Sequence, residues 1–503
     1  MIEVRKGKGG FSMKLNKLLE VLGNDIIVSG DTDIDISALA YDSRKVEPGC
    51  LFVAIPGTQV DGHNYIQQAI DAGAVAIVGE RNVDTGDKPL IIVKESRHAL
   101  AAMSAAFYNY PDRRLRLIGV TGTNGKTTTT YLLKWLLESV GHKVGLVGTI
   151  NNLAGDKILP ATHTTPESLE LYQLFAMMEA EGCDYLVIEA SSHALDQGRV
   201  SACNFAGAVF TNLTQDHLDY HLTIENYCQS KAKLFRQLDP SADNRYGVVN
   251  VDDAHGYVFE EACTAPVWTY GSKDSATTVR LLDYSSSSKG MHFSIAYQRQ
   301  KYAISIPLIG KFNVYNSMAA LTAALAEGMA VDDIIKALAT APQAPGRFEL
   351  IDEGQDFMVV VDYAHTPDGL KNVLNSAEKL DPRRLISVFG CGGNRDRGKR
   401  PIMGRIAGAI SDIAIITSDN PRFEDPMAII DEVEEGIKGV CNNYLIEPDR
   451  AKAIELAINM AEPGDMVVLA GKGHEDYQIL GDKKIHFDDR EYARETIRRR
   501  LAK

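Results

Sequence analysis

The 503-residue sequence predicts a three-domain α/β protein. Short apolar runs rich in Val and Ile alternate with longer segments of helical spacing along most of the chain. This alternation is typical of strands joined by helical crossovers in a mostly parallel sheet. The length agrees, since domains of about 150 residues each would give three. We therefore expect a central α/β domain flanked by two others.

Residues 1–112 are expected to form a small N-terminal α/β domain. The runs LFVAI and AVAIV predict buried strands, and NYIQQAIDAG between them has helical spacing and ends in a glycine. A helix is expected to begin at Met13, in MKLNKLLEVL. The first dozen residues are expected to be an extension with no role in the fold.

Residues 113–345 are expected to form the central domain around a mostly parallel sheet. Strands are predicted at RLIGV, KVGLVG, DYLVIEA, GAVFTNL and YGVVN. Helices are predicted at TTTTYLLKWLLESVG, ESLELYQLFAMMEAEG and ENYCQSKAKLFRQL. The Pro- and Gly-rich segment APQAPGRFE indicates a joint to the next domain.

Residues 346–503 are expected to form a second open α/β sheet of the Rossmann-like type. Strands are predicted at FMVVVDYA, RLISVFG, DIAIITS and DMVVLAG, and helices are expected to begin near Asp368, Pro401, Pro426 and Arg450. In open sheets of this kind, ligands bind outside the carboxyl ends of the strands. The motifs described below follow such strand ends.

Composition and charge exclude several classes of protein. An apolar content of 45% and a charged content of 24% are those of an ordinary soluble protein. The formal net charge of -14 disfavours nucleic acid as a partner. The seven cysteines are scattered, which argues against a disulfide framework and suits a reducing cytoplasm. The N-terminus lacks the apolar segment of a signal peptide, and the longest uncharged stretch, residues 312–326, is too short and polar for a membrane span.

A glycine-rich turn lies between the predicted strand RLIGV and the helix after it. It consists of Gly122, Thr123, Asn124, Gly125, Lys126 and Thr127. Glycines let backbone N–H groups turn toward phosphates, and the helix N-terminus adds a favourable dipole. Lys126 can reach the β- and γ-phosphates, and the Thr127 hydroxyl can bind Mg²⁺. Val120 occupies the first glycine position of the usual motif, and the turn alone leaves ATPases, kinases, GTPases and ligases open.

The motif TGTNGKTT (121–128) resembles that of the Mur ligase family, which also contains folylpolyglutamate synthases. The resemblance covers nearly the whole chain and rests on motifs in family order: YDSR (41–44), HTTPE (163–167), EASSHAL (189–195), TNLTQDHLDYH (211–221), GKFNVYN (310–316), PGRFE (345–349), DYAHTPD (362–368), GCGGNRDRGKRP (390–401), SDNPR (418–422) and GKGHE (471–475). It implies an ATP-dependent ligase that joins meso-diaminopimelate to the D-Glu γ-carboxylate of UDP-MurNAc-L-Ala-D-Glu through an acyl phosphate, in cytoplasmic peptidoglycan precursor synthesis. It also implies that these three small molecules are the partners, that the protein is a monomer, and that it does not insert into a membrane.

The resemblance assigns catalysis to four residues, Lys126, Glu189, His217 and Lys231. Glu189 ends the predicted strand DYLVIEA, where a carboxylate can hold Mg²⁺ beside the γ-phosphate; the alternative is a turn or cap carboxylate. Two Mg²⁺ ions are implied, with Thr127, Glu189, His217 and Lys231 as ligands. Lys231 would be carbamylated by CO₂, which converts an ammonium into an anionic oxygen ligand. Lys233 is a competitor for this modification, and the spacing Y-x-x-x-K favours Lys231.

Two sets of substrate contacts are implied by the same resemblance. The ATP-binding set is Gly122, Thr123, Asn124, Gly125, Lys126, Thr127, Thr128, Asn313, Arg347 and Asp362. The set for the UDP-muramyl dipeptide is Ser43, Thr58, Gln59, Val60, Thr164, Thr165, Ser191, Gln197 and Arg199, in which the first domain would hold the UDP group. Hydroxyl, amide and guanidinium groups suit a substrate with a carboxylate and several amides, although any single Ser or Thr can instead be a turn or cap residue.

The third region is expected to hold the incoming amino acid. The implied contacts are Arg395, Asp419, Asn420, Pro421, Arg422, Gly471 and Glu475. An Arg fork suits the distal carboxylate of diaminopimelate, which lysine lacks. Two alternatives stay open: an L-lysine-adding ligase on the same scaffold, disfavoured by SDNPR and Arg395, and a catalytically inactive nucleotide-binding scaffold. The joint presence of the four catalytic residues disfavours the scaffold. A folylpolyglutamate synthase is a more distant rival, disfavoured by the domain that carries YDSR.

Overall fold

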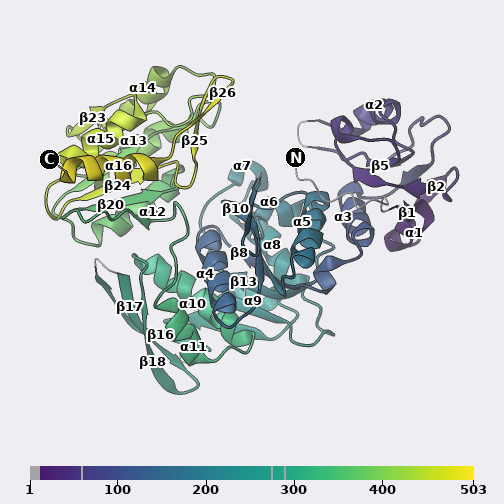
Figure 1. Ribbon diagram of the computed structural model, residues 1–503, viewed down its shortest axis with the longest axis horizontal. Coiled ribbons are helices and arrows are strands. Elements are labelled where there is room, and N and C mark those ends of the chain that lie inside the picture. Colours follow the sequence, from purple (N-terminus) through teal and green to yellow (C-terminus); the bar gives the residue numbers. More distant parts are fainter. Residues whose placement is uncertain (1–11, 58–59, 162, 274–275, 288–289, 503) are drawn as a thin grey trace. The chain divides into compact units, whose positions relative to one another are not determined.

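The computed structural model describes residues 12–57, 60–161, 163–273, 276–287 and 290–502 (Figure 1). The chain divides into two compact units. The first consists of Met1–Leu281, Ala296–Gln300 and Asn316–Ala337, and the second of Leu282–Ile295, Lys301–Tyr315 and Leu338–Lys503. Both units contain sheets of buried strands covered by helices, so the predicted α/β class is confirmed.

The N-terminal part of the first unit contains a five-stranded sheet in the order β2-β7-β6-β5-β4. Strands β4 to β7 pair in parallel, and β2 pairs antiparallel with β7. The elements are β1 (Met13–Lys14), α1 (Leu15–Leu19), β2 (Ile27–Ser29), β3 (Asp35–Ile36), β4 (Ala38–Ala40), β5 (Cys50–Val53), α2 (Ile66–Asp71), β6 (Ala76–Gly79), β7 (Leu90–Ile92) and α3 (Ser96–Phe107). The strands predicted at LFVAI and AVAIV are β5 and β6.

The helix expected to begin at Met13 begins two residues later. Met13 and Lys14 instead form β1, which pairs with Ile36 and Asp35 of β3. Lys14 is extended, and the helix follows from Leu15, whose side chain is buried in the core of this sheet. Backbone pairing with β3 thus competes successfully with helical propensity at these two positions. The predicted N-terminal extension lies almost entirely outside the described residues.

The central sheet has the order β11-β10-β9-β12-β8-β13-β14-β15-β16-β17-β18. Seven neighbouring strands from β9 to β16 pair in parallel, and the unpredicted β10–β11 hairpin adds an antiparallel edge. The strands are β8 (Arg116–Thr121), β9 (Val144–Val147), β10 (Asn151–Ala154), β11 (Lys157–Pro160), β12 (Tyr185–Glu189), β13 (Phe205–Phe210), β14 (Tyr246–Asn250), β15 (Val267–Gly271), β16 (Val279–Ser287), β17 (Gly290–Tyr297) and β18 (Gln300–Ile306). The helices are α4 (Lys126–Ser139), α5 (Ser168–Ala180), α6 (Ser192–Asp196), α7 (Leu218–His221), α8 (Ile224–Arg236), α9 (Gly256–Ala262), α10 (Lys311–Ala326) and α11 (Val331–Leu338).

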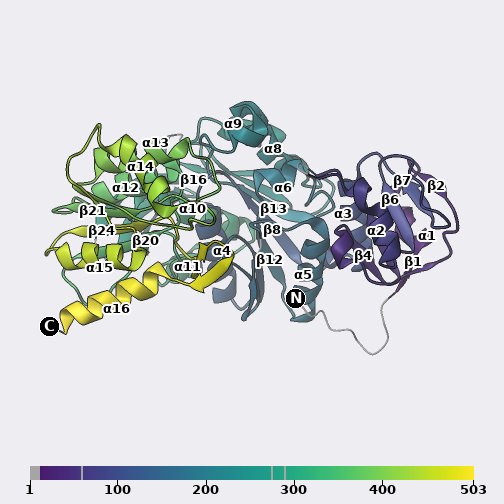
Figure 2. The same cartoon turned by 90° about the horizontal axis from the view of Figure 1, so that it is seen from above.

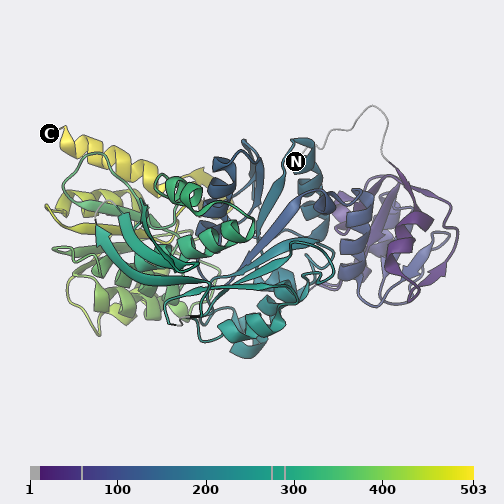
Figure 3. The same cartoon turned by 90° about the horizontal axis from the view of Figure 1, so that it is seen from below.

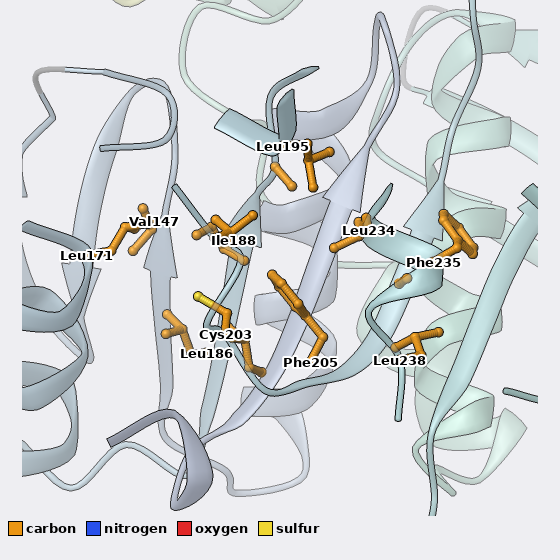
Figure 4. Packing of buried hydrophobic residues seen from close by; sticks show 14 of the residues in the cluster. Val147, Leu171, Leu186, Ile188, Leu195, Cys203, Phe205, Leu234, Phe235 and Leu238 are labelled. Atoms are coloured by element: carbon orange, nitrogen blue, oxygen red, sulfur yellow. The ribbon is translucent and has the colours of Figure 1, made fainter. Parts of the chain in front are cut away.

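Helices α4, α5 and α8 lie along the central strands (Figure 2), and buried side chains from sheet and helices form the central core (Figure 4). Ile188 of β12, Phe205 of β13, Leu171 of α5 and Leu234 of α8 belong to this core, and each is at most 1% exposed. Burial of a large apolar side chain contributes about 1.5–3 kcal/mol relative to exposure. This packing holds rigid the ends of β8, β12 and β13, where the chemical groups described below lie.

The second unit contains a six-stranded sheet in the order β19-β20-β24-β21-β22-β23, parallel except for β19. Its elements are β19 (Glu349–Leu350), β20 (Met358–Asp362), α12 (Pro367–Glu378), β21 (Leu385–Phe389), α13 (Lys399–Ile410), β22 (Ile413–Ile416), α14 (Pro426–Ile437), β23 (Tyr444–Ile446), α15 (Arg450–Met460), β24 (Met466–Ala470), β25 (Tyr477–Leu480), β26 (Lys483–His486) and α16 (Asp489–Leu501). All four predicted strands and four predicted helices occur here. The last helix, α16, leads to the C-terminus (Figure 3).

Within the described part of the chain, no helix is long and apolar enough to cross a membrane. The uncharged stretch noted in the sequence lies in α10, in which Ala319, Ala320 and Leu321 are buried. Its apolar surface is therefore used for packing.

Candidate active site

The glycine-rich turn joins β8 to α4, as its motif predicted. Gly122 and Gly125 have φ angles of 148° and 86°, which side chains with a Cβ rarely adopt. A Cβ on Gly122 would lie 2.0 Å from Thr211 Oγ1, and one on Gly125 would lie 2.2 Å from Asn316 Oδ1. Both glycines are therefore required by backbone conformation and by space.

Lys126 begins α4 and folds back over this turn. Its Nζ donates hydrogen bonds to the carbonyl oxygens of Gly122 at 2.9 Å and Thr123 at 2.8 Å. The backbone N–H of Asn124 donates to Asn212 Oδ1 at 3.0 Å, which fastens the turn to the segment after β13. An ammonium held at a helix N-terminus beside a glycine-rich turn suits the binding of phosphate oxygens.

Glu189 ends β12 with its carboxylate in the interior. It accepts hydrogen bonds from Thr127 Oγ1 at 3.0 Å and from the N–H and Oγ1 of Thr149 at 2.9 and 3.0 Å. The residue is completely buried. Carboxylate and hydroxyl oxygens are ligands that Mg²⁺ prefers, so Thr127 and Glu189 fit a Mg²⁺ ion that would also bind phosphate oxygens and water.

Lys231 lies on α8 with its amine directed at the same turn. Its Nζ donates to Gly122 O at 2.7 Å and lies 4.5 Å from the centre of the Tyr227 ring. The residue is 1% exposed. Burial, reinforced by the charge of Lys126, lowers the pKa of Lys231 well below its ordinary value. Lys233, the competitor for carbamylation, instead pairs with Asp196 at 2.8 Å and is 42% exposed.

His217 lies in an aromatic cluster near Lys231. Its ring centre is 6.1 Å from that of Tyr227 and 4.7 Å from that of His193. Its φ of 52° is unusual for a residue with a side chain. Burial lowers the pKa of the His217 imidazole, which favours the neutral form that can bind a metal ion.

The residues implied for the dipeptide gather beside Glu189. Thr165 Oγ1 donates to Glu189 O at 2.6 Å, and Ser191 N donates to Thr165 Oγ1 at 3.0 Å. Thr164 Oγ1 lies 3.1 Å from Thr149 Oγ1. Arg199 and Gln197 adjoin this group, since Arg199 donates to Thr165 O at 2.9 Å and to Gln197 Oε1 at 2.7 Å. These five predicted residues are therefore brought together.

A pocket of about 540 Å³ lies in the first unit on the N-terminal sheet side. Ser43 and Val60 line it, as does Arg97, and Ser43 Oγ donates to Gln68 Oε1 at 3.1 Å. Thr58 and Gln59, two other residues implied for UDP, lie outside the described residues. The pocket has the volume of a small-molecule site.

The second unit contains the remaining residues implied for ATP. Asp362 ends β20 and accepts a hydrogen bond from Phe348 N at 2.7 Å, and burial raises the pKa of its carboxyl. The Arg347 guanidinium lies 4.8 Å from the Tyr363 ring centre. Asn313 is buried, with Nδ2 donating to Ile309 O at 2.8 Å.

The residues implied for the amino acid occupy loops that follow the carboxyl ends of β21, β22 and β24 in the second sheet. Asn420 Nδ2 donates to Glu475 Oε2 at 3.0 Å, and Arg422 NH1 donates to Gly393 O at 2.9 Å. A Cβ on Gly471 would lie 2.8 Å from Asp419 Oδ2, so these two residues are adjacent. Pro421 also lies here, because Gly393 packs against its carbonyl. Arg395 is exposed.

Two polar residues of these sites were not predicted. Thr149 holds Glu189, and its position just after the predicted strand KVGLVG was a usable signal. Lys472, inside the GKGHE motif, is completely buried, and its Nζ lies 3.1 Å from Glu475 Oε2. A lysine between two glycines gives no such indication from the sequence alone.

The sequence was compared with models of known protein families and with characterised proteins. The sequence matches the models described as "Mur ligase family, catalytic domain" over residues 35–108, "Mur ligase middle domain" over 120–324 and "Mur ligase, glutamate ligase domain" over 346–473. A protein of Geobacillus thermodenitrificans named UDP-N-acetylmuramoyl-L-alanyl-D-glutamate--2,6-diaminopimelate ligase is 47% identical, over 97% of this chain and 100% of its own. The chain belongs to the Mur ligase family.

Other Mur ligases extend the comparison. The Caldanaerobacter subterraneus protein of the same name is 45% identical over 96% of this chain and 99% of its own. A solved structure of a diaminopimelate ligase of that name has a TM-score of 0.69 and 33% identity, covering 97% of this chain and 99% of the other. A Mycobacterium tuberculosis folylpolyglutamate synthase, at 18% identity and a TM-score of 0.60, covers 74% of this chain and 92% of its own, and shares the fold.

Proposed function

We propose that this chain is an ATP-dependent ligase that joins meso-diaminopimelate to the D-Glu γ-carboxylate of UDP-MurNAc-L-Ala-D-Glu in peptidoglycan precursor synthesis. The observation that carries the proposal is 47% identity along essentially the full length of a relative named for this reaction. The phosphate-binding turn, the buried Glu189 and the loop that holds Arg422 provide matching chemistry.

The first step transfers a phosphoryl group. A γ-carboxylate oxygen of D-Glu attacks the γ-phosphorus of ATP, the bond to the bridging oxygen breaks, and ADP leaves. The backbone N–H groups of the turn and Lys126 bind the phosphates and offset their charge. We propose that Thr127, Glu189, His217 and a carbamylated Lys231 hold two Mg²⁺ ions, which would neutralise further charge on the phosphates. The depressed pKa of Lys231 supports carbamylation, because a neutral amine is the form that adds CO₂.

The second step forms the amide. The amine of diaminopimelate attacks the acyl carbon, and the tetrahedral intermediate expels phosphate while the nitrogen loses a proton. We propose that Arg395 and Arg422 bind the distal carboxylate and that Asp419, Asn420 or Glu475 accepts from the distal ammonium, with Pro421 and Gly471 shaping the loop. Asn313, Arg347 and Asp362 are proposed to bind ATP.

The organisation of the chain is part of the proposal. We assign UDP binding to residues 1–112 through Ser43, Thr58, Gln59 and Val60, ATP binding mainly to residues 113–345, and the amino acid to residues 346–503. Thr164, Thr165, Ser191, Gln197 and Arg199 are assigned to the dipeptide. A monomer in the cytoplasm, with no nucleic acid or membrane partner, completes the proposal, and the seven free cysteines support this location.

Isotope transfer tests the acyl phosphate. The substrate is prepared with ¹⁸O in the γ-carboxylate of D-Glu, and the released phosphate is examined by mass spectrometry after one turnover with ATP and diaminopimelate. One ¹⁸O atom in the phosphate is expected, because the attacking carboxylate oxygen leaves with phosphorus. Phosphate without ¹⁸O, or equal release of phosphate in the absence of diaminopimelate, would contradict the scheme.

A further inference from the structure

A charged cluster lies where the 540 Å³ pocket meets the start of α5. Arg97, the second residue of α3, donates from NH1 to the Glu167 carboxylate and, at 3.3 Å, to Gln197 Oε1. Arg199 Nε lies 3.2 Å from the same Glu167 oxygen. The side chains of Arg97, Glu167 and Arg199 are only 23%, 16% and 17% exposed. Two guanidinium groups share one carboxylate, so the cluster has an excess of positive charge and can accept an anion.

The two arginines differ in the donors that they have left. Arg199 uses Nε, NH1 and NH2 in hydrogen bonds to Gln197 and Thr165. Arg97 uses NH1 alone, and its Nε and NH2 have no hydrogen-bond partner among the described residues. Arg97 and Glu167 both line the pocket. The unused Nε–NH2 edge of a guanidinium matches the two oxygens of a carboxylate.

The position of Arg97 is fixed before any ligand binds. The neighbouring Ser96 is completely buried, and its N–H and Oγ both donate to Glu80 Oε1 at 2.8 Å, which anchors the first turn of α3. The Glu167 carboxylate accepts from Arg97 NH1 and so orients the guanidinium. A charged donor held in this way loses little entropy on binding.

We propose that Arg97 binds the α-carboxylate of the D-glutamyl residue, so that the γ-carboxylate is the one presented for phosphorylation. This inference rests on the proposed function, in which the substrate offers two carboxylates on one residue and only one reacts. Arg199 Nε, NH1 and NH2 each already donate to Gln197 or Thr165, whereas the whole Nε–NH2 edge of Arg97 is open to a carboxylate that lies beside the dipeptide residues. Glu167 acts as a positioning residue for Arg97.

The test compares two substrates and three proteins. UDP-MurNAc-L-Ala-D-Glu and its analogue with an α-carboxamide are assayed with the wild type, Arg97→Met and Tyr41→Phe. Tyr41 OH donates to Glu170 Oε1 at 2.9 Å, so Tyr41→Phe breaks a neighbouring link to α5 without touching the arginines. We expect Arg97→Met to raise KM for the natural substrate about 10- to 100-fold, as for loss of a charged hydrogen bond, with kcat largely retained.

The decisive quantity is the preference for carboxylate over carboxamide. We expect the wild type and Tyr41→Phe to show this preference and Arg97→Met to lose it. A preference of equal size in Arg97→Met would overturn the inference, as would its loss in Tyr41→Phe. If Arg97→Met lowers the melting temperature, the same comparison is made with Arg97→Lys, which keeps the positive charge but lacks the two-pronged guanidinium. Arg97→Lys is expected to show a reduced preference for the carboxylate substrate. An unchanged preference in Arg97→Lys would also overturn the inference. A wild type that ligates neither substrate would contradict the proposed function instead.

Discussion

The region of the first unit proposed to bind phosphates and the region of the second proposed to bind the amino acid are built differently. In the first, Glu189 ends β12 and Lys231 lies on α8, and both side chains are buried and hydrogen-bonded. In the second, Arg395 is exposed, and Arg422 has a φ of 53° in a loop held by backbone contacts. Asp419 and Asn420 of the second region are buried, so the contrast lies in Arg395 and Arg422, which extend from loops that can vary without disturbing the core. We infer that the first region sets the rate of phosphoryl transfer and the second sets the choice of amine.

Replacing Lys126 should produce the largest change. Lys126→Ala removes the ammonium held over the phosphate turn, and kcat should fall about 100- to 1,000-fold, as when one transition-state donor is lost. The measurement is ADP release with saturating substrates. Lys134→Ala, on the same helix and paired with Glu138, is the matched control and should leave the rate unchanged. An equal fall in kcat with diaminopimelate and with a weak alternative amine would locate the effect in phosphoryl transfer. Retained activity in Lys126→Ala would contradict the role inferred for the first region.

Replacing Lys231 should be almost as damaging, and its neighbour provides the control. Lys231→Ala should reduce kcat about 100-fold, because the buried amine proposed to become a metal ligand is lost. Lys233→Ala removes a more exposed lysine two residues away and should change the rate little. Growth in ¹³C-bicarbonate should give the wild type and Lys233→Ala one carbamate carbonyl signal by NMR that Lys231→Ala lacks. The same signal in all three proteins would refute the assignment.

Replacing Arg422 should change the choice of amine more than the chemistry. Arg422→Met removes a donor to the distal carboxylate, so kcat/KM for diaminopimelate should fall about 10- to 100-fold while that for lysine changes little. Competition between the two amines, scored by product mass, measures this ratio. Arg405→Met, at an exposed position of α13, is the control. A parallel loss for both amines would show that Arg422 supports the fold or the chemistry.

A smaller effect concerns acid stability beside the amino-acid loops. The completely buried Arg400 pairs with Glu424 at 2.9 Å, and this hydrogen bond lowers the pKa of Glu424 to about 2. A depressed carboxyl pKa stabilises the fold above the unfolded value of 4.5 and loses that contribution as the pH falls toward 2. Urea unfolding should therefore show Glu424→Gln less stable than the wild type at pH 6, with a gap that narrows between pH 4.5 and 2. A difference in unfolding free energy that stays constant with pH would contradict a cause in the Glu424 pKa. The control Glu435→Gln, at an exposed position, should unfold like the wild type at every pH.

Local sequence patterns predicted the central buried strands better than the short strands at the edges of the sheets. The strands around Ile188 and Val360 are continuous apolar runs, which buried parallel strands require. The β10–β11 hairpin was missed because its strands are short and partly exposed, and Met13 was misassigned because a strand pairing with Ile36 cannot be read from local helical spacing.

Motifs located part of the candidate site in the fold. Lys126 follows β8 and Glu189 ends β12, as their strand patterns predicted, and the structure places Thr127 in contact with Glu189. The position of Thr149 after KVGLVG was a local signal, but its contact with Glu189 depends on the pairing of β9 with β12. The contact of Arg97 with Glu167 joins residues 70 positions apart and needed the three-dimensional structure.

An amine screen tests the central claim most directly. Purified protein is given UDP-MurNAc-L-Ala-D-Glu, ATP and Mg²⁺ with equal concentrations of meso-diaminopimelate and L-lysine, and the products are identified by mass. A site that pairs the distal carboxylate should reject lysine by a factor of up to about 10⁴. The account predicts a product enlarged by diaminopimelate alone; comparable lysine product, or no product from either amine, would contradict it.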